Sequence, residues 1–328
     1  MQNEQVRPSL EVPPRIIPVP SHLSPAAQAQ LAMGGMSLPA WPEQHDVFAW
    51  RELIARMDKY GLAALQQMTA QIPATVETIV ADGVSIVVAR PLGVPDDGAI
   101  YLEFHGGSLI WGGGESCAHM AKISAATLRA TVWSVDYRMA PDHPFPAALA
   151  DGVAAYKAVL KQAAPGKVII GGPSAGGNVA AATILKARDE GLPMPAAALL
   201  TSPELDLTES GDSFNTLMGV DTALTSTLLP ASQLYAGGHD LTDPYLSPLF
   251  GDFTRGFPPT WLQSGTRDLF LSNTVRMHRA LRQAGIEAEL HIFEAATHIM
   301  FMSGPEADDR TQAMRQFADR HWGRNQKL

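Results

Sequence analysis

The chain has 328 residues, of which 46% are hydrophobic and 17% charged, enough for one large α/β domain with an appendage or for two modest domains. Its formal net charge is −9 and no cluster of Lys and Arg stands out, which argues against nucleic acid as a partner. Residues 1–20 lack the apolar stretch of a signal peptide and no window has the apolar length of a membrane helix, so we expect no stable membrane insertion and a cytoplasmic location.

The first 88 residues divide into three stretches. Residues 1–42 hold six prolines before residue 26, which interrupt regular elements, so we expect an arm here rather than part of a core. Between residues 43 and 68 the apolar positions approximate helical spacing, which predicts one or two amphipathic helices. The period then changes: residues 75–80 and 84–88 flank Asp82-Gly83, which predicts a β-hairpin with a two-residue turn.

From residue 99 onward strands and helices alternate. The predicted strands are residues 99–104, 131–135, 168–170, 196–201, 259–264 and 288–293, and the predicted helices are residues 118–128, 147–160, 175–185, 273–284 and 309–322. This alternation implies parallel strands joined by right-handed crossovers, with helices on both faces of one sheet. Residues 205–239 lose the rhythm, so we interpret them as an insertion over the carboxyl edge of the sheet.

The stretch around Ser174 has the pattern of a nucleophile elbow. Residues 172–176 spell Gly-Pro-Ser-Ala-Gly between a short apolar strand and a helix with few polar residues. In the G-x-S-x-G motif a sharp turn lifts the serine hydroxyl out of the sheet, and Gly172 and Gly176 leave room for that turn. The five residues alone also fit an ordinary glycine-rich loop, so the prediction depends on partners elsewhere in the chain.

A serine nucleophile needs a base within hydrogen-bonding reach and a carboxylate that orients the base. Asp268 follows the strand 259–264 and His298 follows the strand 288–293, in the order serine, acid, base that α/β-hydrolases use. Both lie at carboxyl ends of strands, where open α/β sheets gather reactive groups. Each has a structural alternative, since Asp268 could cap the following helix and His298 could be a buried loop histidine.

Other acids and histidines fit these two roles less well. Four competing acids lie in or beside the insertion, or directly before His298: Asp206, Asp240, Asp243 and Glu294. Four other histidines fall inside predicted helices or a strand, where surface or packing roles are usual: His119, His278, His291 and His321.

Residues 105–108, His-Gly-Gly-Ser, directly follow the strand 99–104. Acyl transfer develops negative charge on a carbonyl oxygen, which fixed N–H donors must stabilise. We assign these donors to the amides of Gly106, Gly107 and Ala175, with His105 anchoring the loop rather than acting as a base. The alternative is a flexible glycine loop that binds no ligand.

Longer motifs give the chain a specific resemblance. Residues 136–148 read Asp-Tyr-Arg-Met-Ala-Pro-Asp-His-Pro-Phe-Pro-Ala-Ala, and residues 202–207 read Ser-Pro-Glu-Leu-Asp-Leu. With the His-Gly-Gly loop and the elbow, these motifs over about residues 75–320 resemble the bacterial esterases related to hormone-sensitive lipase, called family IV, within the α/β-hydrolases. The corresponding family patterns are D-Y-R-x-A-P-E-H-P-F-P-A-A and S-P-x-x-D-L.

The resemblance implies an α/β-hydrolase fold with a mostly parallel eight-stranded sheet, helices on both faces and a helical cap. The cap would comprise residues 1–72 and 207–243, and the catalytic core residues 73–206 and 244–328. The resemblance also implies metal-independent carboxylesterase activity on short to medium acyl chains, no cofactor, and frequent homodimers through the last strand and its neighbouring helix. The single cysteine, Cys117, excludes intrachain disulfides and a Cys-based metal site, and we expect it to be a small buried filler.

Two positions depart from the family pattern. Ser108 stands where the family has a third glycine, and Pro173 stands where an acidic residue or threonine is usual before the nucleophile. We expect both to alter substrate preference or loop order more than reaction type. Five apolar side chains near the oxyanion loop or in the insertion are candidates for the substrate pocket, and equally for packing of the cap: Leu109, Trp111, Phe214, Leu217 and Met218.

The sequence thus predicts a serine carboxylesterase that hydrolyses a small-molecule ester through an acyl-enzyme intermediate, with Ser174, His298 and Asp268 as its triad. The same machinery would also serve a lactone, carbamate or amide hydrolase. A ligand-binding receptor on the same fold is a further alternative. The complete set of serine, aspartate and histidine argues against that alternative.

Overall fold

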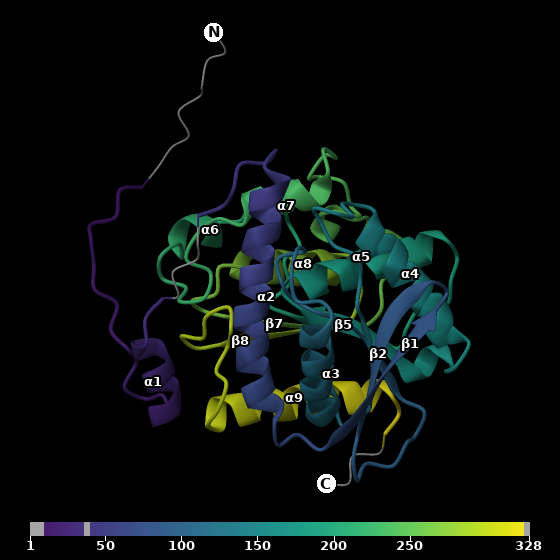
Figure 1. Cartoon of the computed structure of the whole chain (residues 1–328). Coiled ribbons are helices and arrows are strands. Elements are labelled where there is room, and N and C mark those ends of the chain that lie inside the picture. The colour runs from purple at the N-terminus through teal and green to yellow at the C-terminus, as the bar shows by residue number, and fades with distance from the viewer. Residues whose placement is uncertain (1–9, 36–39, 325–328) are drawn as a thin grey trace.

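One eight-stranded sheet organises the computed structural model, which describes residues 10–35 and 40–324 (Figure 1). Its strands are β1 (Ala74–Ala81), β2 (Val84–Pro91), β3 (Ile100–Phe104), β4 (Thr131–Val135), β5 (Val168–Pro173), β6 (Ala197–Thr201), β7 (Thr260–Gly265) and β8 (Ala288–Phe293). They are ordered β1-β2-β4-β3-β5-β6-β7-β8, antiparallel in the β1–β2 and β2–β4 pairs and parallel elsewhere. The predicted mostly parallel sheet is confirmed, with β5 between β3 and β6 at its centre. The predicted homodimer contact would lie at the β8 edge and stays a prediction.

The β1–β2 hairpin forms at the predicted turn. Ala81 pairs with Val84, so Asp82 and Gly83 are the two loop residues. Their φ angles are 50° and 83°, and a type I′ turn requires positive φ at both central positions. The Asp-Gly pair therefore fixes the register of this hairpin.

Helices cover both faces of the sheet. They are α1 (Pro25–Ala32), α2 (Val47–Thr69), α3 (Glu115–Leu128), α4 (Ala147–Leu160), α5 (Ala175–Asp189), α6 (Ser213–Thr216), α7 (Leu229–Ala236), α8 (Leu271–Gln283) and α9 (Pro305–His321). Helices α3 and α9 pack against one face, and α4, α5 and α8 pack against the other. The buried strands follow a period of two. On β5, Ile169 faces α3 and α9, whereas Val168 and Ile170 face the opposite helices.

The prediction that residues 1–42 form only an arm is wrong for the stretch that contains α1. Pro25 stands at the first helical position, where a missing N–H breaks no helical hydrogen bond, and the Ser24 side chain caps the helix by accepting from Ala27 N at 3.2 Å. Three apolar side chains of this segment are buried against the loop after β8: Leu23, Ala27 and Leu31 pack with Ala295, Ala296, Met300 and Phe301. Residues 1–9 and 36–39 of the expected arm lie outside the described residues.

The predicted helical region before the hairpin forms one helix, α2, capped by Asp46. Its Trp50 and Leu53 side chains are buried in the main core. The segment before α2 is tied to the insertion, because the Trp41 indole donates to Thr227 O at 2.8 Å. The insertion itself carries α6 and α7, and the predicted cap boundaries stay a prediction.

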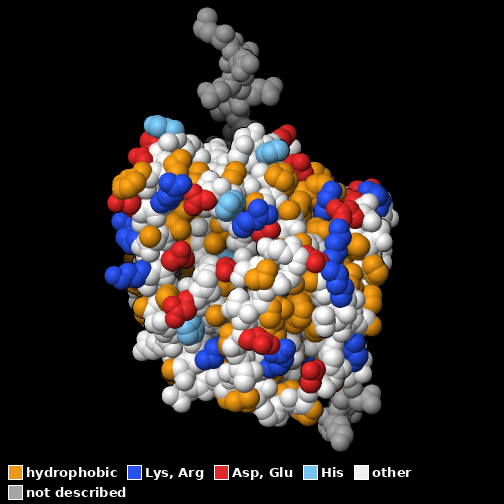
Figure 2. Space-filling model, turned by 45° about the vertical axis from the view of Figure 1, so that its right-hand side comes forward, with side chains coloured by type: hydrophobic (Ala, Val, Ile, Leu, Met, Phe, Trp, Pro, Cys, Tyr) orange, Lys and Arg blue, Asp and Glu red, His pale blue; other side chains and the backbone are white. Residues whose placement is uncertain are grey.

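The surface carries charges of both signs. On the face that Figure 2 presents, basic and acidic side chains are interspersed. Within residues 10–35 and 40–324 no helix combines the length and the apolar character that crossing a bilayer requires.

We expect Gly176→Ala to destabilise the fold strongly. A Cβ atom at Gly176, in the first turn of α5, would overlap the carbonyl oxygen of Phe104 on β3. Overpacking against backbone that cannot move away should cost about 3 kcal/mol or more, measured as a loss in free energy of unfolding. The matched control is Gly61→Ala in α2, where a Cβ meets open space and the gain in helix propensity should raise stability by up to about 1 kcal/mol. Equal stabilities for the two variants would contradict the tight elbow packing.

Candidate active site

Ser174 lies on a strained turn between β5 and α5. Its φ is 55° and its ψ is −124°, a backbone conformation that residues other than glycine rarely adopt. The turn is held by Ser174 N, which donates to Thr201 O on the neighbouring strand at 3.0 Å. A Cβ atom at Gly172 would overlap the Phe104 carbonyl oxygen, so the elbow requires glycine two residues before Ser174.

The three residues that the motif order singled out meet at the carboxyl edge of the sheet. Ser174 Oγ lies 3.0 Å from His298 Nε2, and His298 Nδ1 lies 3.2 Å from Asp268 Oδ1. They follow β5, β8 and β7 respectively, so the parallel strands place them side by side. This geometry lets the imidazole accept a proton from the hydroxyl while its other nitrogen donates to the carboxylate.

Asp268 is fully buried and accepts several hydrogen bonds. Its Oδ2 accepts from the hydroxyls of Ser202 and Ser264, and its Oδ1 accepts from Phe270 N at 3.0 Å. Burial would raise the pKa of this carboxyl, but the hydrogen bond and charge of His298 and the two serines hold the pKa below its usual value. The group therefore stays ionised. The carboxylate thus contacts both Phe270 N, directly before α8, and His298.

Sequence reasoning did not assign Ser202 or Ser264 to this site. Both serines stand at the carboxyl ends of strands, and Ser202 also opens the Ser-Pro-Glu-Leu-Asp-Leu motif, so these were the available signals. Their hydroxyls fix the rotation of the Asp268 carboxylate, which leaves Oδ1 directed at His298.

His298 lies among acidic groups. Burial would lower its pKa, but the hydrogen bond and charge of Asp268, together with the charges of Asp221 and Glu204, raise the pKa above its usual value. Phe270 packs edge-on against the imidazole with ring centroids 4.8 Å apart. These surroundings therefore favour the imidazolium that forms when His298 accepts a proton.

The loop after β3 passes directly against the elbow. A Cβ atom at Gly106 would lie 3.3 Å from Pro173 O and 3.6 Å from the Ser174 Cβ atom. Gly107 has a φ of 130°, and a Cβ there would overlap the Trp111 carbonyl oxygen. Across residues 10–35 and 40–324, no acceptor is recorded for the amides of Gly106 and Gly107, and the first-turn amide of Ala175 lies where a helix leaves its N–H groups unpaired. Three N–H donors are therefore free for a ligand oxygen.

Ser108 has a backbone conformation that suits the glycine of the family pattern at this position. Its φ is 49°, in the left-handed region that glycine occupies without steric cost, and Leu109 follows with a φ of 66°. Ser108 is buried and leaves the preceding glycine amides in place.

His105 contacts both its own loop and Tyr137. Its imidazole stacks on the Tyr137 ring with centroids 4.1 Å apart, and its Nδ1 lies 2.9 Å from Gly106 O. The Tyr137 hydroxyl donates to His105 O at 2.8 Å. His105 is thus held between the loop and the tyrosine of the Asp-Tyr-Arg motif.

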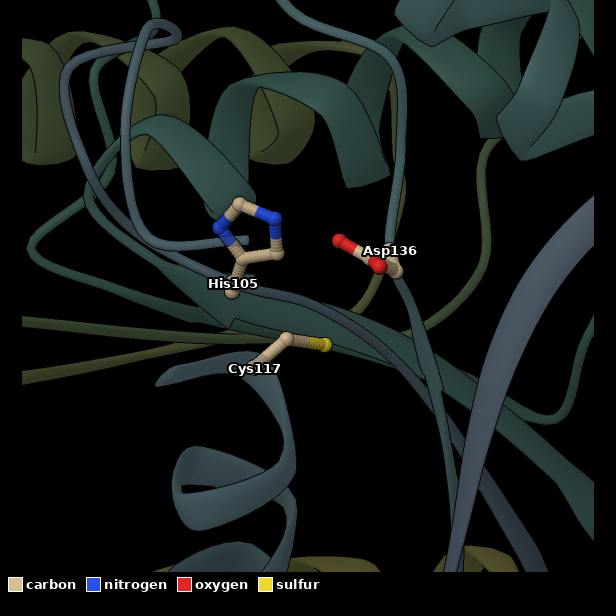
Figure 3. A group of neighbouring side chains, drawn as sticks. All are labelled: His105, Cys117 and Asp136. Atoms are coloured by element: carbon tan, nitrogen blue, oxygen red, sulfur yellow. The ribbon is translucent and has the colours of Figure 1, made fainter. Parts of the chain in front are cut away.

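Cys117 lies beside this anchor, a neighbourhood that the sequence interpretation did not foresee. Figure 3 shows His105, Cys117 and Asp136 facing one another, with their ligand-type atoms within 4.8 Å. The donor set fits a packed scaffold rather than a metal centre, because burial raises the pKa of the thiol, which bonds to Ser134 Oγ at 3.3 Å. Asp136 already accepts from Gly114 N at 2.8 Å. Cys117 is the buried filler that the sequence predicted.

A cavity of about 230 Å³ opens beside Ser174 and His298. Pro173 and Met300 form part of its wall. None of the five predicted pocket residues lines this cavity within the described ranges: Leu109 is buried in the core, Trp111 stacks on Trp41, Phe214 packs on Phe270, and Leu217 and Met218 lie in the insertion. Leu109, Trp111 and Phe214 thus contribute to packing, which was the alternative role for these side chains.

Comparisons with known proteins agree with this geometry. A family model described as alpha/beta hydrolase fold matches residues 101–302. An acetyl-hydrolase from Streptomyces hygroscopicus is 37% identical over 212 residues, 64% of this chain and 67% of that protein. Among solved structures, esterase E25 matches with a TM-score of 0.87 and 32% identity over 95% of this chain and 99% of that one. EstE7, a homologue of hormone-sensitive lipase from a metagenome library, matches with a TM-score of 0.73 and 31% identity over 83% of this chain and 98% of that one. The chain therefore belongs to the α/β-hydrolase fold family and, within it, to the esterases related to hormone-sensitive lipase, which are carboxylic ester hydrolases.

Proposed function

We propose that the protein hydrolyses short to medium acyl esters with Ser174 as nucleophile, His298 as base and Asp268 as the group that orients the base. The observation that carries the proposal is the continuous contact from Ser174 Oγ to His298 Nε2 and from His298 Nδ1 to Asp268 Oδ1. A receptor that had lost turnover would not need this contact.

In the first half-reaction, Ser174 Oγ attacks the ester carbonyl carbon while His298 Nε2 takes the hydroxyl proton. The carbonyl oxygen becomes negatively charged and accepts hydrogen bonds from the amides of Gly106, Gly107 and Ala175. His298 then gives the proton to the departing alkoxide, which leaves as an alcohol. Water attacks the acyl-enzyme along the same route, releases the acid and restores Ser174.

The size of the cavity favours small acyl groups. Its volume of about 230 Å³ lies below the roughly 300–1,000 Å³ of typical ligand pockets. The relative from Streptomyces hygroscopicus is named an acetyl-hydrolase, which also favours a short acyl chain. The same machinery accommodates lactones, carbamates or amides, so the substrate class needs a direct comparison.

A panel of p-nitrophenyl esters from acetate to dodecanoate tests this function, with release of p-nitrophenol followed by absorbance. We expect kcat/KM for the acetate to butyrate esters to exceed that for the dodecanoate ester by about tenfold or more. The reason is that the additional methylene groups of a long acyl chain do not fit inside the small cavity and must extend out of it. A lactone, a carbamate and an anilide measured at the same concentration provide the comparison of substrate class. Absence of turnover on every ester would contradict the proposal.

A further inference from the structure

Asp221, in the insertion between α6 and α7, is a buried acid that no step of the reaction above uses. Its side chain is 1% exposed. Oδ1 accepts from the backbone N–H groups of Ala223 at 2.8 Å and Leu224 at 3.2 Å, both within the insertion. Oδ2 accepts from Leu269 N at 2.8 Å and from His298 N at 3.2 Å. His298 N also lies 3.4 Å from Oδ1, so Oδ1 serves mainly the insertion while Oδ2 faces the two loops.

The Oδ2 contacts reach both loops of the candidate triad. Leu269 directly follows Asp268, and His298 is the base itself. One carboxylate oxygen therefore joins the loop after β7 to the loop after β8. The neighbouring Thr222 hydroxyl, which bonds to Thr297 Oγ1 at 3.2 Å, also connects the insertion to the loop after β8.

A purely local role does not explain this arrangement. The turn at residues 221–224 requires only Oδ1, since a side-chain oxygen that accepts from the residue two positions later completes an Asx turn. Burial of a carboxylate is costly unless its oxygens are well paired. Oδ2 obtains that pairing from the two loops, so its contacts link the insertion to the reacting groups.

We propose that Asp221 is a positioning residue, which holds the Asp268 and His298 loops together and supplies a second negative charge to the imidazolium formed during attack by Ser174. This inference rests on the proposed triad. It assigns to the insertion a part in the reaction besides covering the carboxyl edge of the sheet.

The acids around His298 come from three different segments. Asp268 follows β7, Glu204 follows β6, and Asp221 belongs to the insertion, and all three raise the pKa of His298. Burial raises the pKa of Glu204 to about 8, so at neutral pH that group is mostly uncharged. Burial also raises the pKa of Asp221, while the charge of His298 lowers it. Asp221 accepts backbone N–H groups on both of its oxygens, as an ionised carboxylate does, so Asp221 and Asp268 supply the negative charge near the imidazole.

The Asp221→Asn variant can test the contacts with the two loops while the local turn is preserved. The amide oxygen can keep the place of Oδ1 and preserve the bond from Ala223 N. The amide NH₂ then faces the N–H groups of Leu269 and His298, so two acceptor contacts become donor-to-donor contacts. The variant loses the negative charge at the same time.

We expect Asp221→Asn to lower kcat for p-nitrophenyl butyrate by about 10- to 100-fold through misplacement of the base, with KM changed less than about twofold. Loss of the negative charge should lower the pKa of His298, so the neutral base persists to lower pH. The acid limb of kcat/KM should therefore move to lower pH by about half a unit or more. The measurement is the pH profile of kcat/KM for the wild type and the variant.

Asp206→Asn is the matched control. Asp206 is also fully buried and lies in the same stretch after β6, but its carboxylate bonds to Thr208, Ser210 and Arg276 rather than to the triad loops. We expect its acid limb to stay where the wild type has it, even where the melting temperature falls. A folded Asp221→Asn protein whose acid limb coincides with that of the wild type would overturn the positioning role, whatever its kcat. Wild-type activity in Ser174→Ala would instead refute the proposed triad, so the two failures are distinguishable.

Discussion

Replacing Ser174 with alanine should lower kcat/KM for p-nitrophenyl butyrate by about 10⁵-fold or more. In the proposed mechanism the acyl group is carried by the Ser174 hydroxyl, which lies 3.0 Å from His298 Nε2. Without it, only the N–H donors and substrate binding remain, which leave a small residual rate over water. Initial rates at saturating and subsaturating ester concentrations measure the loss.

The fold of the Ser174→Ala variant should stay intact, because the serine side chain packs at the cavity surface rather than in the core. A melting temperature close to that of the wild type would show this, since alanine keeps the Cβ atom and leaves the backbone strain at this position unchanged. Ser21→Ala, at an exposed position far along the chain, is the control that should keep full activity. A Ser174→Ala protein with wild-type turnover would exclude Ser174 as the nucleophile.

Asp268→Ala should reduce kcat by about 10⁴-fold, because it removes both the orientation of His298 and the charge that stabilises the imidazolium. Asp268→Asn separates these two effects. Its oxygen can remain at the Oδ1 place, where it accepts from Phe270 N and His298 Nδ1. Its NH₂ group would donate to Ser202 and Ser264, whose hydroxyls can rotate to accept.

We therefore expect Asp268→Asn to retain more activity than Asp268→Ala and to shift the acid limb of its pH profile to lower pH, because the pKa of His298 falls when the negative charge is lost. Asp240→Asn is the control, since Asp240 competed with Asp268 in the sequence but lies in an exposed turn with Thr242. If Asp240→Asn lost as much kcat as Asp268→Ala, the assignment of Asp268 as the acid would be wrong.

The meeting of Ser174, Asp268 and His298 was predictable because parallel strands constrain it. Each residue follows the carboxyl end of a parallel strand, and the order of strands in the sheet brings such strand ends together whatever lies between them in the chain. The hairpin turn was predictable for a different reason, since the backbone of Asp82-Gly83 has few other choices.

The supporting contacts were not predictable, because they depend on segments far apart in the chain. Asp221 is 77 residues from His298, and nothing in its own neighbourhood indicates the distant N–H group that it accepts. Helix α1 is too short and too rich in prolines nearby to be stable by itself, and it forms because Leu23, Ala27 and Leu31 are buried by a loop about 270 residues later. The pocket residues stay a prediction, since apolar residues near a site are equally suited to its packing, as the burial of Leu109 and Phe214 shows.

The attachment of α1 also bears on how the loop around His298 keeps its order. The Gln30 side chain donates to Met300 O and accepts from Met302 N, and Ser24 donates to Glu306 at the start of α9. The loop that carries His298 is therefore bonded to α1, and α1 is in turn bonded to α9. Local unfolding of α1 would remove these contacts while the strands of the sheet stay paired, so the order of this loop depends on a short helix outside the sheet.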